Sequence, residues 1–275
     1  MANVTLEAVK SLRERLGTGM VDTKNALVEA GGDMEKAVEI LRLKGAKGNA
    51  KRADRSTSEG LVAATVSGET ATMIELACET DFVAKGEKFI ALADSVLAAV
   101  AAAGAATVDE AVAAPSDAGT VADLINDQAA ILGEKMELRR VAQVAGPAHE
   151  IYLHKTNKDL PPQVGVVVGY SGGDAETARS IAQHISFANP EYLSRDDVPA
   201  ELVEAERKIV EEISRNEGKP EAALPKIIEG RLTGYFKQVA LLEQDYAKDN
   251  KMTVAKVIAD AGLTITGFAR FKVGA

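Results

Sequence analysis

The sequence has no tryptophan, one cysteine and three histidines among its 275 residues, and aromatic residues make up only 4% of it. The single cysteine, Cys78, excludes a disulfide framework and a cysteine-rich zinc site. The histidines at positions 149, 154 and 184 leave little basis for a histidine metal site or a catalytic triad. With so few large rings, any core must be built from small aliphatic side chains on closely approaching helices.

Charge and hydropathy narrow the class of protein further. The formal net charge is −9 and the pI is near 5.1, which argues against a general nucleic-acid coat protein. Hydrophobic residues make up 46% of the chain, too many for a disordered protein. The first ten residues resemble neither a secretory signal nor a transit peptide, and the longest uncharged apolar stretch, residues 95–108, is too short to cross a bilayer. We therefore expect a cytoplasmic protein that does not engage a membrane.

Residues 1–45 have the pattern of three short helices. Apolar residues recur every three or four positions from Leu6 to Leu16, which gives the first helix an apolar stripe. Glycines at 17 and 19 interrupt it, and the glycine pair at 31–32 ends the second helix. Asp33 can cap a third helix, which we expect to close near Gly45.

A basic segment follows this helical domain. From residue 41 to residue 55 the chain holds six basic residues against one aspartate and is interrupted by glycines. It predicts a flexible, positively charged linker over residues 46–59. Such a segment could contact nucleic acid, but it has no interleaved aromatic side chains that would stack on bases, so a solvated linker is the better interpretation.

Strands alternate with helices from residue 60 onward, and a hairpin followed by a helix occurs twice. We therefore predict a core in two parts, residues 60–136 and 137–275. The expected elements are a β-hairpin at 61–66 and 70–76, a helix at 82–103, helices in pieces over 104–133 with a break at Pro115, strands at 137–144, 150–154 and 165–170, and a helix capped by Asp174 that runs to Ile185.

Two amphipathic helices are predicted within residues 198–246. A stripe on the first consists of Leu202, Ala205, Ile209 and Ile213, and a second stripe extends over residues 224–242. With a turn at residues 218–220, these segments predict an antiparallel helical hairpin. A short helix over 254–261 and a closing strand over 264–273 complete an α+β fold.

No set of residues points to an enzyme. The chain has no phosphate-binding loop of the form Gly-x4-Gly-Lys-Ser/Thr. His149 and His154 are five residues apart on adjoining strands and should face opposite sides of a sheet, whereas Cys78 and His184 are expected in the core. The sequence offers no nucleophile, paired acid and base or ligand set, so we expect no catalysis, no metal and no cofactor.

The segment from Glu75 to Lys85, ELACETDFVAK, joins a predicted strand to a predicted helix. On spacing alone it is a local structural feature. Thr80 or Asp81 would cap the helix by accepting a backbone N–H, and Phe82 or Val83 would pack into the core.

Together with residues 12–27, LRERLGTGMVDTKNAL, this segment closely resembles the bacterial translation elongation factor Ts family, whose members are guanine-nucleotide exchange partners of elongation factor Tu. The resemblance implies an α+β fold with a UBA-like three-helix domain, a two-part core with antiparallel sheets and a helical hairpin of coiled-coil type. It extends in order over the whole chain and includes SIAQH at 180–184, NPEY at 189–192, GKP at 218–220, EGR at 229–231 and GFARF at 267–271.

The resemblance also implies a mechanism that needs no catalytic acid or base. The turn Thr80-Asp81-Phe82-Val83 would disturb the Mg²⁺ and phosphate region of elongation factor Tu, because Mg²⁺ requires near-ideal octahedral geometry. Phe82 would act as an apolar wedge and Asp81 would act near the metal, while Thr80 and Val83 set the turn. Capping and wedging can coexist in one segment.

Other parts of the chain have supporting roles in this interpretation. Arg13, Gly19, Met20 and Lys24 would dock on the GTP-binding domain of the partner, with bundle packing as an equal alternative for Met20. His184 matches a family position near the partner interface. The helical hairpin is either a further partner contact or a self-association surface, and the complex is one-to-one or two-to-two.

Some positions depart from the family pattern, among them Leu16, Thr18 and Ala77. The chain ends at Ala275 after the closing strand, and we expect none of the extra C-terminal helical module that some members carry. Two rival interpretations stay open: an RNA- or ribosome-binding adaptor that uses the basic segment, and a small-molecule enzyme that depends on His184 or Asp174. Neither explains the two signatures, so we expect neither nucleic acid nor a small-molecule substrate as a partner.

Overall fold

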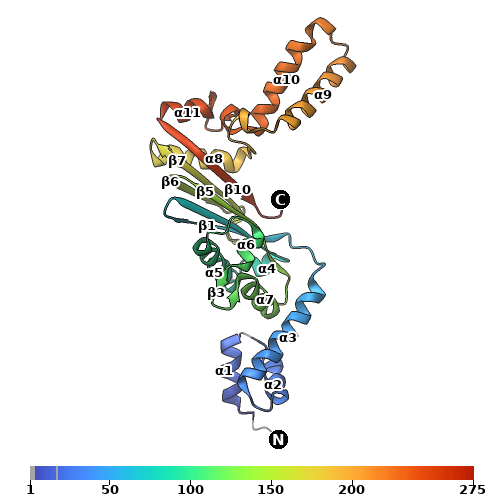
Figure 1. Cartoon of the computed structure of the whole chain (residues 1–275), viewed down its shortest axis with the longest axis vertical. Helices are drawn as coiled ribbons and strands as arrows, with labels where there is room; N and C mark the ends of the chain where they lie inside the picture. Colours follow the sequence, from blue (N-terminus) through green and yellow to red (C-terminus); the bar gives the residue numbers. More distant parts are fainter. Residues whose placement is uncertain (1–3, 17) are drawn as a thin grey trace.

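A computed structural model describes residues 4–16 and 18–275 of the chain and shows an elongated α+β molecule (Figure 1). Three N-terminal helices lie at one end, two antiparallel sheets with their helices occupy the middle, and a helical hairpin projects at the other end. The predicted fold class is confirmed. Within the described residues, no helix combines the length and the apolar character needed to span a membrane.

The three predicted N-terminal helices are present as α1 (Leu6–Leu16), α2 (Met20–Glu29) and α3 (Met34–Arg52). Asp33 caps α3, because its carboxylate accepts hydrogen bonds from the backbone N–H groups of Glu35 and Lys36. The helices pack around a small aliphatic core that consists of Val9, Leu12, Ala26, Leu27, Ala37 and Leu41.

The predicted end of the third helix at Gly45 is wrong, and α3 continues to Arg52 through the segment predicted as a flexible linker. Gly45 lies where α3 crosses α7 (Val121–Leu132), and a Cβ atom at this position would lie 2.8 Å from the Cβ of Ala130. The glycine therefore permits two helices to approach closely and does not end a helix. Residues 53–58 connect α3 to the first sheet.

The first sheet has the order β1-β2-β5, with β1 (Glu59–Ser67), β2 (Thr70–Cys78) and β5 (Met136–Ala145) all antiparallel to their neighbours. The predicted hairpin is confirmed as β1 and β2. The strand predicted at 137–144 is present as β5, but it pairs with β2 and not with the strands of the second part of the core. The predicted division at residue 136/137 therefore separates two paired strands.

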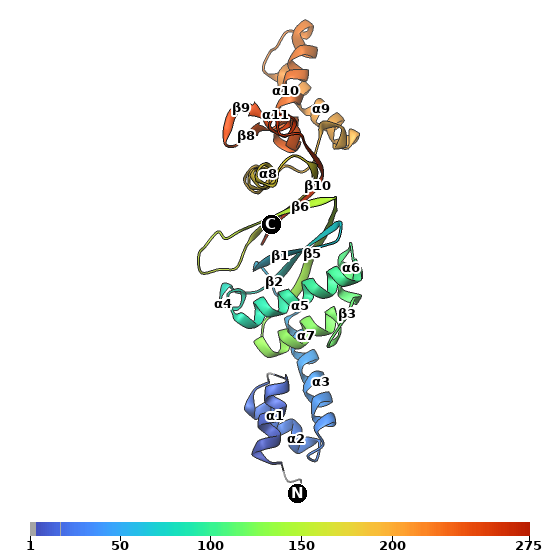
Figure 2. The same cartoon turned by 90° about the vertical axis from the view of Figure 1, so that its left-hand side faces the viewer.

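Helices cover one face of the first sheet and separate it from the N-terminal helices (Figure 2). The helix predicted over 82–103 is two helices, α4 (Asp81–Ala84) and α5 (Glu87–Ala103), because Gly86 adopts an extended conformation and begins a new helix. The break predicted at Pro115 is confirmed. It lies between α6 (Val108–Ala113) and α7, where β3 (Pro115–Ser116) and β4 (Gly119–Thr120) form a small hairpin.

The second sheet has the order β10-β7-β6, with β6 (Ala148–His154), β7 (Val164–Gly172) and β10 (Leu263–Lys272). His149 and His154 thus lie on one strand rather than two, and their odd spacing points them to opposite faces. Helices α8 (Ala175–Ala188) and α11 (Val254–Asp260) pack on this sheet. The two sheets meet through a shared cluster that consists of Val62, Ala71, Met73, Val144, Val167 and Phe271.

The predicted helical hairpin is present as α9 (Ala200–Asn216) and α10 (Leu224–Val239). However, Leu202, Ile209 and Ile213 of the predicted stripe on α9 are exposed, and Val210 faces α10 instead. Helix α9 carries apolar residues on two faces, so periodicity alone does not select the face that packs. The short elements beside the hairpin are the 3-10 turns η1 (Arg195–Asp197), η2 (Glu221–Ala223) and η3 (Leu241–Glu243) and the strands β8 (Asp245–Tyr246) and β9 (Asp249–Thr253).

Candidate functional site

The chain turns sharply between the end of β2 at Cys78 and the start of α5 at Glu87, and we call residues 79–86 the 79–86 turn. Thr80 has extended backbone geometry and is the N-cap of α4. Its Oγ1 accepts a hydrogen bond from the Val83 N–H over 3.3 Å. The predicted capping role is thus confirmed, and it belongs to Thr80 rather than Asp81.

Helix α4 consists of two exposed residues followed by two buried ones. Val83 and Ala84 are buried in the hydrophobic core beneath the first sheet, whereas the Phe82 ring is 76% exposed. Of the two residues predicted to pack into the core, Val83 does so and Phe82 does not. Asp81 is also exposed and lies 3.7 Å from the Lys85 ammonium, which in turn lies 5.6 Å from the centroid of the Phe82 ring. The turn therefore presents a carboxylate and an aromatic ring side by side.

A residue far away in sequence holds the 79–86 turn in place. The Oε2 atom of Glu134 accepts hydrogen bonds from the backbone N–H groups of Glu79 and Thr80, both over 3.1 Å. Its Oε1 accepts a third from the Thr80 hydroxyl over 2.5 Å. In return, the Lys135 N–H donates to Glu79 Oε1 over 2.6 Å. Sequence reasoning missed Glu134, because no local pattern connects it to Thr80, 54 residues earlier.

Cys78 lies directly beneath the turn and is fully buried. Burial, with a smaller contribution from the Glu134 carboxylate, raises the pKa of its thiol to about 12. The thiol donates a hydrogen bond to the Thr80 carbonyl oxygen over 3.3 Å. Cys78 is therefore a core residue, as predicted, and not a thiolate nucleophile.

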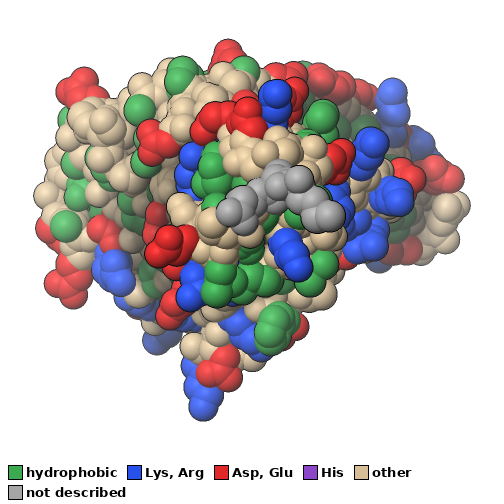
Figure 3. All heavy atoms as spheres, turned by 90° about the horizontal axis from the view of Figure 1, so that it is seen from below, with side chains coloured by type: hydrophobic (Ala, Val, Ile, Leu, Met, Phe, Trp, Pro, Cys, Tyr) green, Lys and Arg blue, Asp and Glu red, His purple; other side chains and the backbone are tan. Residues whose placement is uncertain are grey.

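The second set of predicted site residues lies in the N-terminal helices. Arg13 on α1 and Lys24 on α2 are exposed, as are Gly19 and Met20 at the start of α2. Met20 is 42% exposed and lies outside the core of the bundle. Hydrophobic side chains lie next to Lys and Arg side chains on the face of the molecule seen from this end (Figure 3). These residues and the 79–86 turn belong to different parts of the elongated molecule (Figure 1).

His184 lies inside the second part of the core and is only 3% exposed. Its Nδ1 accepts a hydrogen bond from the Ala247 N–H over 3.1 Å, so the proton resides on Nε2, which lies 2.9 Å from Gln244 Oε1. Burial lowers the pKa of His184, partly offset by the bond to Gln244. The core position expected for His184 is confirmed. Its predicted partner contact gains no support from this placement and stays a prediction.

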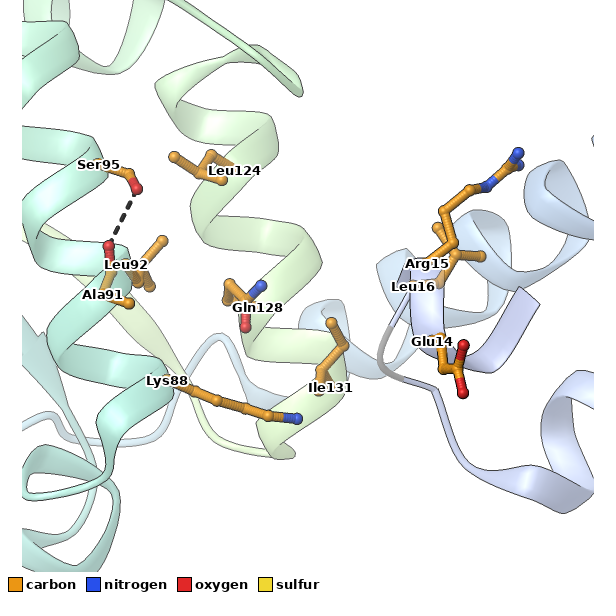
Figure 4. Close-up of a pocket in the computed structure, with 10 residues that line it drawn as sticks. All are labelled: Glu14, Arg15, Leu16, Lys88, Ala91, Leu92, Ser95, Leu124, Gln128 and Ile131. Carbon is orange, nitrogen blue, oxygen red and sulfur yellow. Dashed lines mark hydrogen bonds between the residues drawn. The ribbon is translucent and has the colours of Figure 1, made fainter. Parts of the chain in front are cut away.

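An open cavity of about 330 Å³ lies between the end of α1 and helices α5 and α7 (Figure 4). Among its lining residues, Ser95 donates to the Ala91 carbonyl oxygen and is not paired with a base. Within residues 4–16 and 18–275, no cluster of His, Cys, Asp and Glu side chains is arranged to hold a metal ion. The cavity lining consists of Glu14, Arg15, Leu16, Lys88, Ala91, Leu92, Ser95, Leu124, Gln128 and Ile131.

Comparison with known proteins shows which family this chain belongs to. The family model described as Elongation factor TS matches residues 79–275. The chain is 76% identical over 275 residues to elongation factor Ts of Clavibacter michiganensis subsp. michiganensis, with the whole of both chains covered. It is 57% identical over 277 residues to elongation factor Ts of Micrococcus luteus, again with full coverage of both. The chain belongs to the elongation factor Ts family.

Membership in the elongation factor Ts family gives the chain a role in translation elongation. The resemblance inferred from the two short segments is thereby confirmed. The matched region begins at Glu79, the first residue of the 79–86 turn, and the relatives extend the match over the N-terminal helices as well.

Proposed function

We propose that the chain is a guanine-nucleotide exchange factor that binds elongation factor Tu in its GDP form and promotes release of GDP. The complex is one-to-one or two-to-two, and the chain performs no covalent chemistry of its own. The observation that carries the proposal is the pair Asp81 and Phe82. Both side chains are exposed, on a turn whose next two residues, Val83 and Ala84, are buried in the core.

Exchange requires the factor to prefer the nucleotide-free GTPase over the loaded one. By linkage, the factor then weakens nucleotide binding as strongly as the nucleotide weakens binding of the factor. A GTPase holds its nucleotide through backbone N–H groups around the phosphates and through Mg²⁺, whose octahedral ligand shell tolerates little displacement. A small displacement of groups near this site is therefore sufficient to weaken nucleotide binding.

Phe82 is suited to cause a displacement of this kind because its ring is exposed before binding. An aromatic side chain buries about 150–250 Å² when it inserts into a partner, which is worth several kcal/mol at about 25 cal/mol per Å². Asp81 places a negative charge next to the ring, where it competes with the anionic ligands of a metal ion. Val83 and Ala84 keep the turn in place, because their side chains are buried in the core.

The N-terminal helices supply a second contact in this proposal. Arg13, Gly19, Met20 and Lys24 are exposed and combine an apolar side chain with two cations, a composition suited to a mixed protein surface. A two-point attachment fixes the orientation of the 79–86 turn relative to the nucleotide site.

The arrangement of the basic segment favours exchange over the rival RNA-binding function. The basic segment is helical over most of its length, and several of its cations have intramolecular partners. Arg42 lies 3.6 Å from Asp127, Lys44 lies 2.5 Å from Asp22, and Arg55 lies 3.3 Å from Glu79. Such cations are less available to phosphate groups than a solvated linker would be.

The test is release of fluorescent GDP from purified elongation factor Tu, with the parent chain and with its Asp81→Ala/Phe82→Ala variant. Fast release with the parent and slow release with a folded variant would support exchange through the 79–86 turn. Equal acceleration by both would move the mechanism to the remaining interface. A parent chain that does not accelerate release would overturn the proposed function.

A further inference from the structure

We propose that Glu134 is the positioning residue of the 79–86 turn, and that its carboxylate holds Asp81 and Phe82 in the geometry that the partner meets. The inference rests on the proposed function for its consequence in exchange, but its structural part can be measured without a partner. Glu134 lies between the end of α7 and the start of β5, and the turn lies between β2 and α4.

Glu134 supplies the acceptor for two backbone N–H groups that the sheet leaves without a partner. Strand β2 ends at Cys78, so the N–H groups of Glu79 and Thr80 have no partner in the sheet ladder. Both donate to Glu134 Oε2, and a carboxylate acceptor makes such bonds about twice as strong as a neutral one. One side chain therefore fixes the direction in which the chain leaves the sheet.

Glu134 also orients the Thr80 side chain that caps α4. The Thr80 hydroxyl donates its only proton to Glu134 Oε1, which leaves the Oγ1 lone pairs directed to the Val83 N–H. Glu134 thus sets the rotamer of Thr80, the residue that caps α4. A helix of four residues is too short to be stable alone, so α4 depends on its cap and on the burial of Val83 and Ala84.

The 79–86 turn and the segment at Glu134 and Lys135 bind each other in both directions. Glu134 accepts from the backbone of the turn, and Glu79 of the turn accepts from the Lys135 N–H. Gly133 makes this arrangement possible, because it ends α7 with a φ of 78°, a left-handed conformation that favours glycine. A side chain of each segment thus accepts from the main chain of the other. These bonds restrain both translation and rotation of the 79–86 turn relative to residues 134–135.

A turn held in this way loses little conformational freedom when a partner binds. The ring of Phe82 is exposed, and its backbone is fixed by contacts that do not involve the ring. Ordering a loose turn would consume part of the binding free energy, whereas a pre-positioned turn avoids that loss. Removing the carboxylate should therefore weaken binding more than it lowers the rate within the complex.

The structural arm of the test uses the absence of tryptophan from the chain. A Phe82→Trp reporter carries the only indole, and its time-resolved fluorescence anisotropy reports the mobility of the turn. We expect Glu134→Ala to add a fast, large-amplitude component to the anisotropy decay. Glu134→Gln should stay closer to the parent, because its amide oxygen can still accept the two backbone N–H bonds. The matched control is Asp117→Ala, which removes an exposed acid from the loop between β3 and β4.

The functional arm keeps Phe82 and measures release of fluorescent GDP from elongation factor Tu. We expect Glu134→Ala to raise the concentration that gives half-maximal acceleration about tenfold, with a near-parental rate at saturation. Thermal unfolding of each variant tests whether it is folded under the assay conditions. Glu134→Asp replaces Glu134→Ala if the alanine variant is unfolded, because it keeps the charge but is one methylene too short to reach all three donors of the turn.

The two arms separate the two proposals. An unchanged anisotropy decay in Glu134→Ala, or an equal change in the Asp117→Ala control, overturns the positioning role whatever the exchange assay gives. A parent chain without exchange activity overturns the proposed function, and the anisotropy arm still decides the role of Glu134. Increased mobility with unchanged half-maximal concentration overturns the link between order of the turn and binding.

Discussion

At the scale of single residues, neighbours in sequence have opposite roles. Phe82 is exposed and Val83 is buried, although both are apolar and adjacent. The sequence predicts that one of them packs into the core and gives no means of choosing, because the choice depends on the direction in which α4 leaves the sheet. That direction is set by Glu134, which lies 54 residues from Thr80.

Truncation of these two side chains should separate stability from function. We expect Val83→Ala to lower the free energy of unfolding by about 2 kcal/mol, because it removes buried methyl groups and leaves a cavity. Phe82→Ala should change it by less than about 0.5 kcal/mol, as is usual for an exposed site. Urea unfolding followed by circular dichroism measures both. A large loss in Phe82→Ala would mean that the ring packs in solution.

Glu75 is a fully buried acid that ties the end of the chain to the first sheet. Its Oε2 accepts from Arg140 Nε over 2.5 Å, and the Gly274 N–H donates to its Oε1 over 3.4 Å. Glu75→Ala would leave the Arg140 charge without its partner, so we expect a loss of about 3 kcal/mol in the free energy of unfolding. Hydrogen exchange at residues 271–274 should accelerate at the same time. Glu75→Gln, which keeps the shape, is the matched control and should lose less.

His184 predicts a dependence of stability on pH. Burial lowers its pKa in the folded state below the ordinary value of 6.5, so the unfolded chain binds more protons once the pH falls under about 6.5. The contribution of His184 to stability is present above that pH and declines below it, by at most about 1.4 kcal/mol per pH unit. Urea unfolding between pH 7 and pH 5 should show a shallower decline in His184→Gln than in the parent.

At the scale of elements, α9 shows what periodicity can and cannot predict. The two helices of the hairpin and the turn between them follow from the sequence, but Leu202, Ile209 and Ile213 face solvent. Val210 and Ser214 form the buried side of α9, and Ser214 donates to the Val210 carbonyl oxygen. The sequence pattern of α9 places apolar residues on both of these faces, and only the position of α10 determines which face is buried.

Alanine substitutions on the two faces of α9 should therefore differ. Val210→Ala should lower the free energy of unfolding of the hairpin by about 2 kcal/mol, because Val210 packs against α10. Ile209→Ala should be neutral or slightly stabilising, since it replaces a half-exposed β-branched residue by a better helix former. Hydrogen exchange across α9 and α10 resolves the two effects. Equal losses of stability at both positions would show that Ile209 makes a contact that this structure does not contain.

Most elements follow from the sequence because their signals are local. The hairpin of β1 and β2 has a turn between two alternating strands, and Asp174 caps α8 through the Thr177 N–H as its position predicts. The errors share a different cause. Gly45 reads as a helix end and Gly86 as an interior residue of a helix, because the contacts that decide their roles come from elsewhere in the chain. The partner strand of β5 is undetermined for the same reason, since register is a tertiary property.

At the scale of the whole molecule, α3 joins the N-terminal helices to the core. It rests on α7, where the Asn49 side chain donates to the Asn126 carbonyl oxygen over 2.9 Å and Arg42 faces Asp127. The close crossing at Gly45 lies between these two contacts along α3. The position of Arg13, Met20 and Lys24 relative to the 79–86 turn thus depends on the packing of α3 against α7.

Two glycines of α3 offer a matched test of this interface. Gly45→Ala places a methyl group 2.8 Å from the Cβ of Ala130, so α3 and α7 must separate. At Gly48 the added methyl group would lie 3.3 Å from the Arg52 guanidinium, which donates to Asn49 and to the Ala129 carbonyl oxygen and needs to shift by only a few tenths of an ångström. Gly48→Ala should therefore raise helix stability by about 1 kcal/mol. We expect faster hydrogen exchange in α7 and a larger radius of gyration by X-ray scattering for Gly45→Ala alone. The same response from both variants would show that the crossing does not hold the N-terminal helices.

The continuity of α3 also determines which changes of length the chain can accept. An α-helix advances about 1.5 Å and turns about 100° per residue, so the 19 residues of α3 span about 28 Å without a flexible joint. One residue inserted between Leu41, in the bundle core, and Gly45, at the crossing with α7, would rotate the N-terminal bundle relative to the core by about 100° about the axis of α3. Arg13, Met20 and Lys24 would then face another direction with every side chain of the bundle intact. Residues 42–44, between the bundle core at Leu41 and the crossing at Gly45, can therefore vary in sequence far more freely than in number.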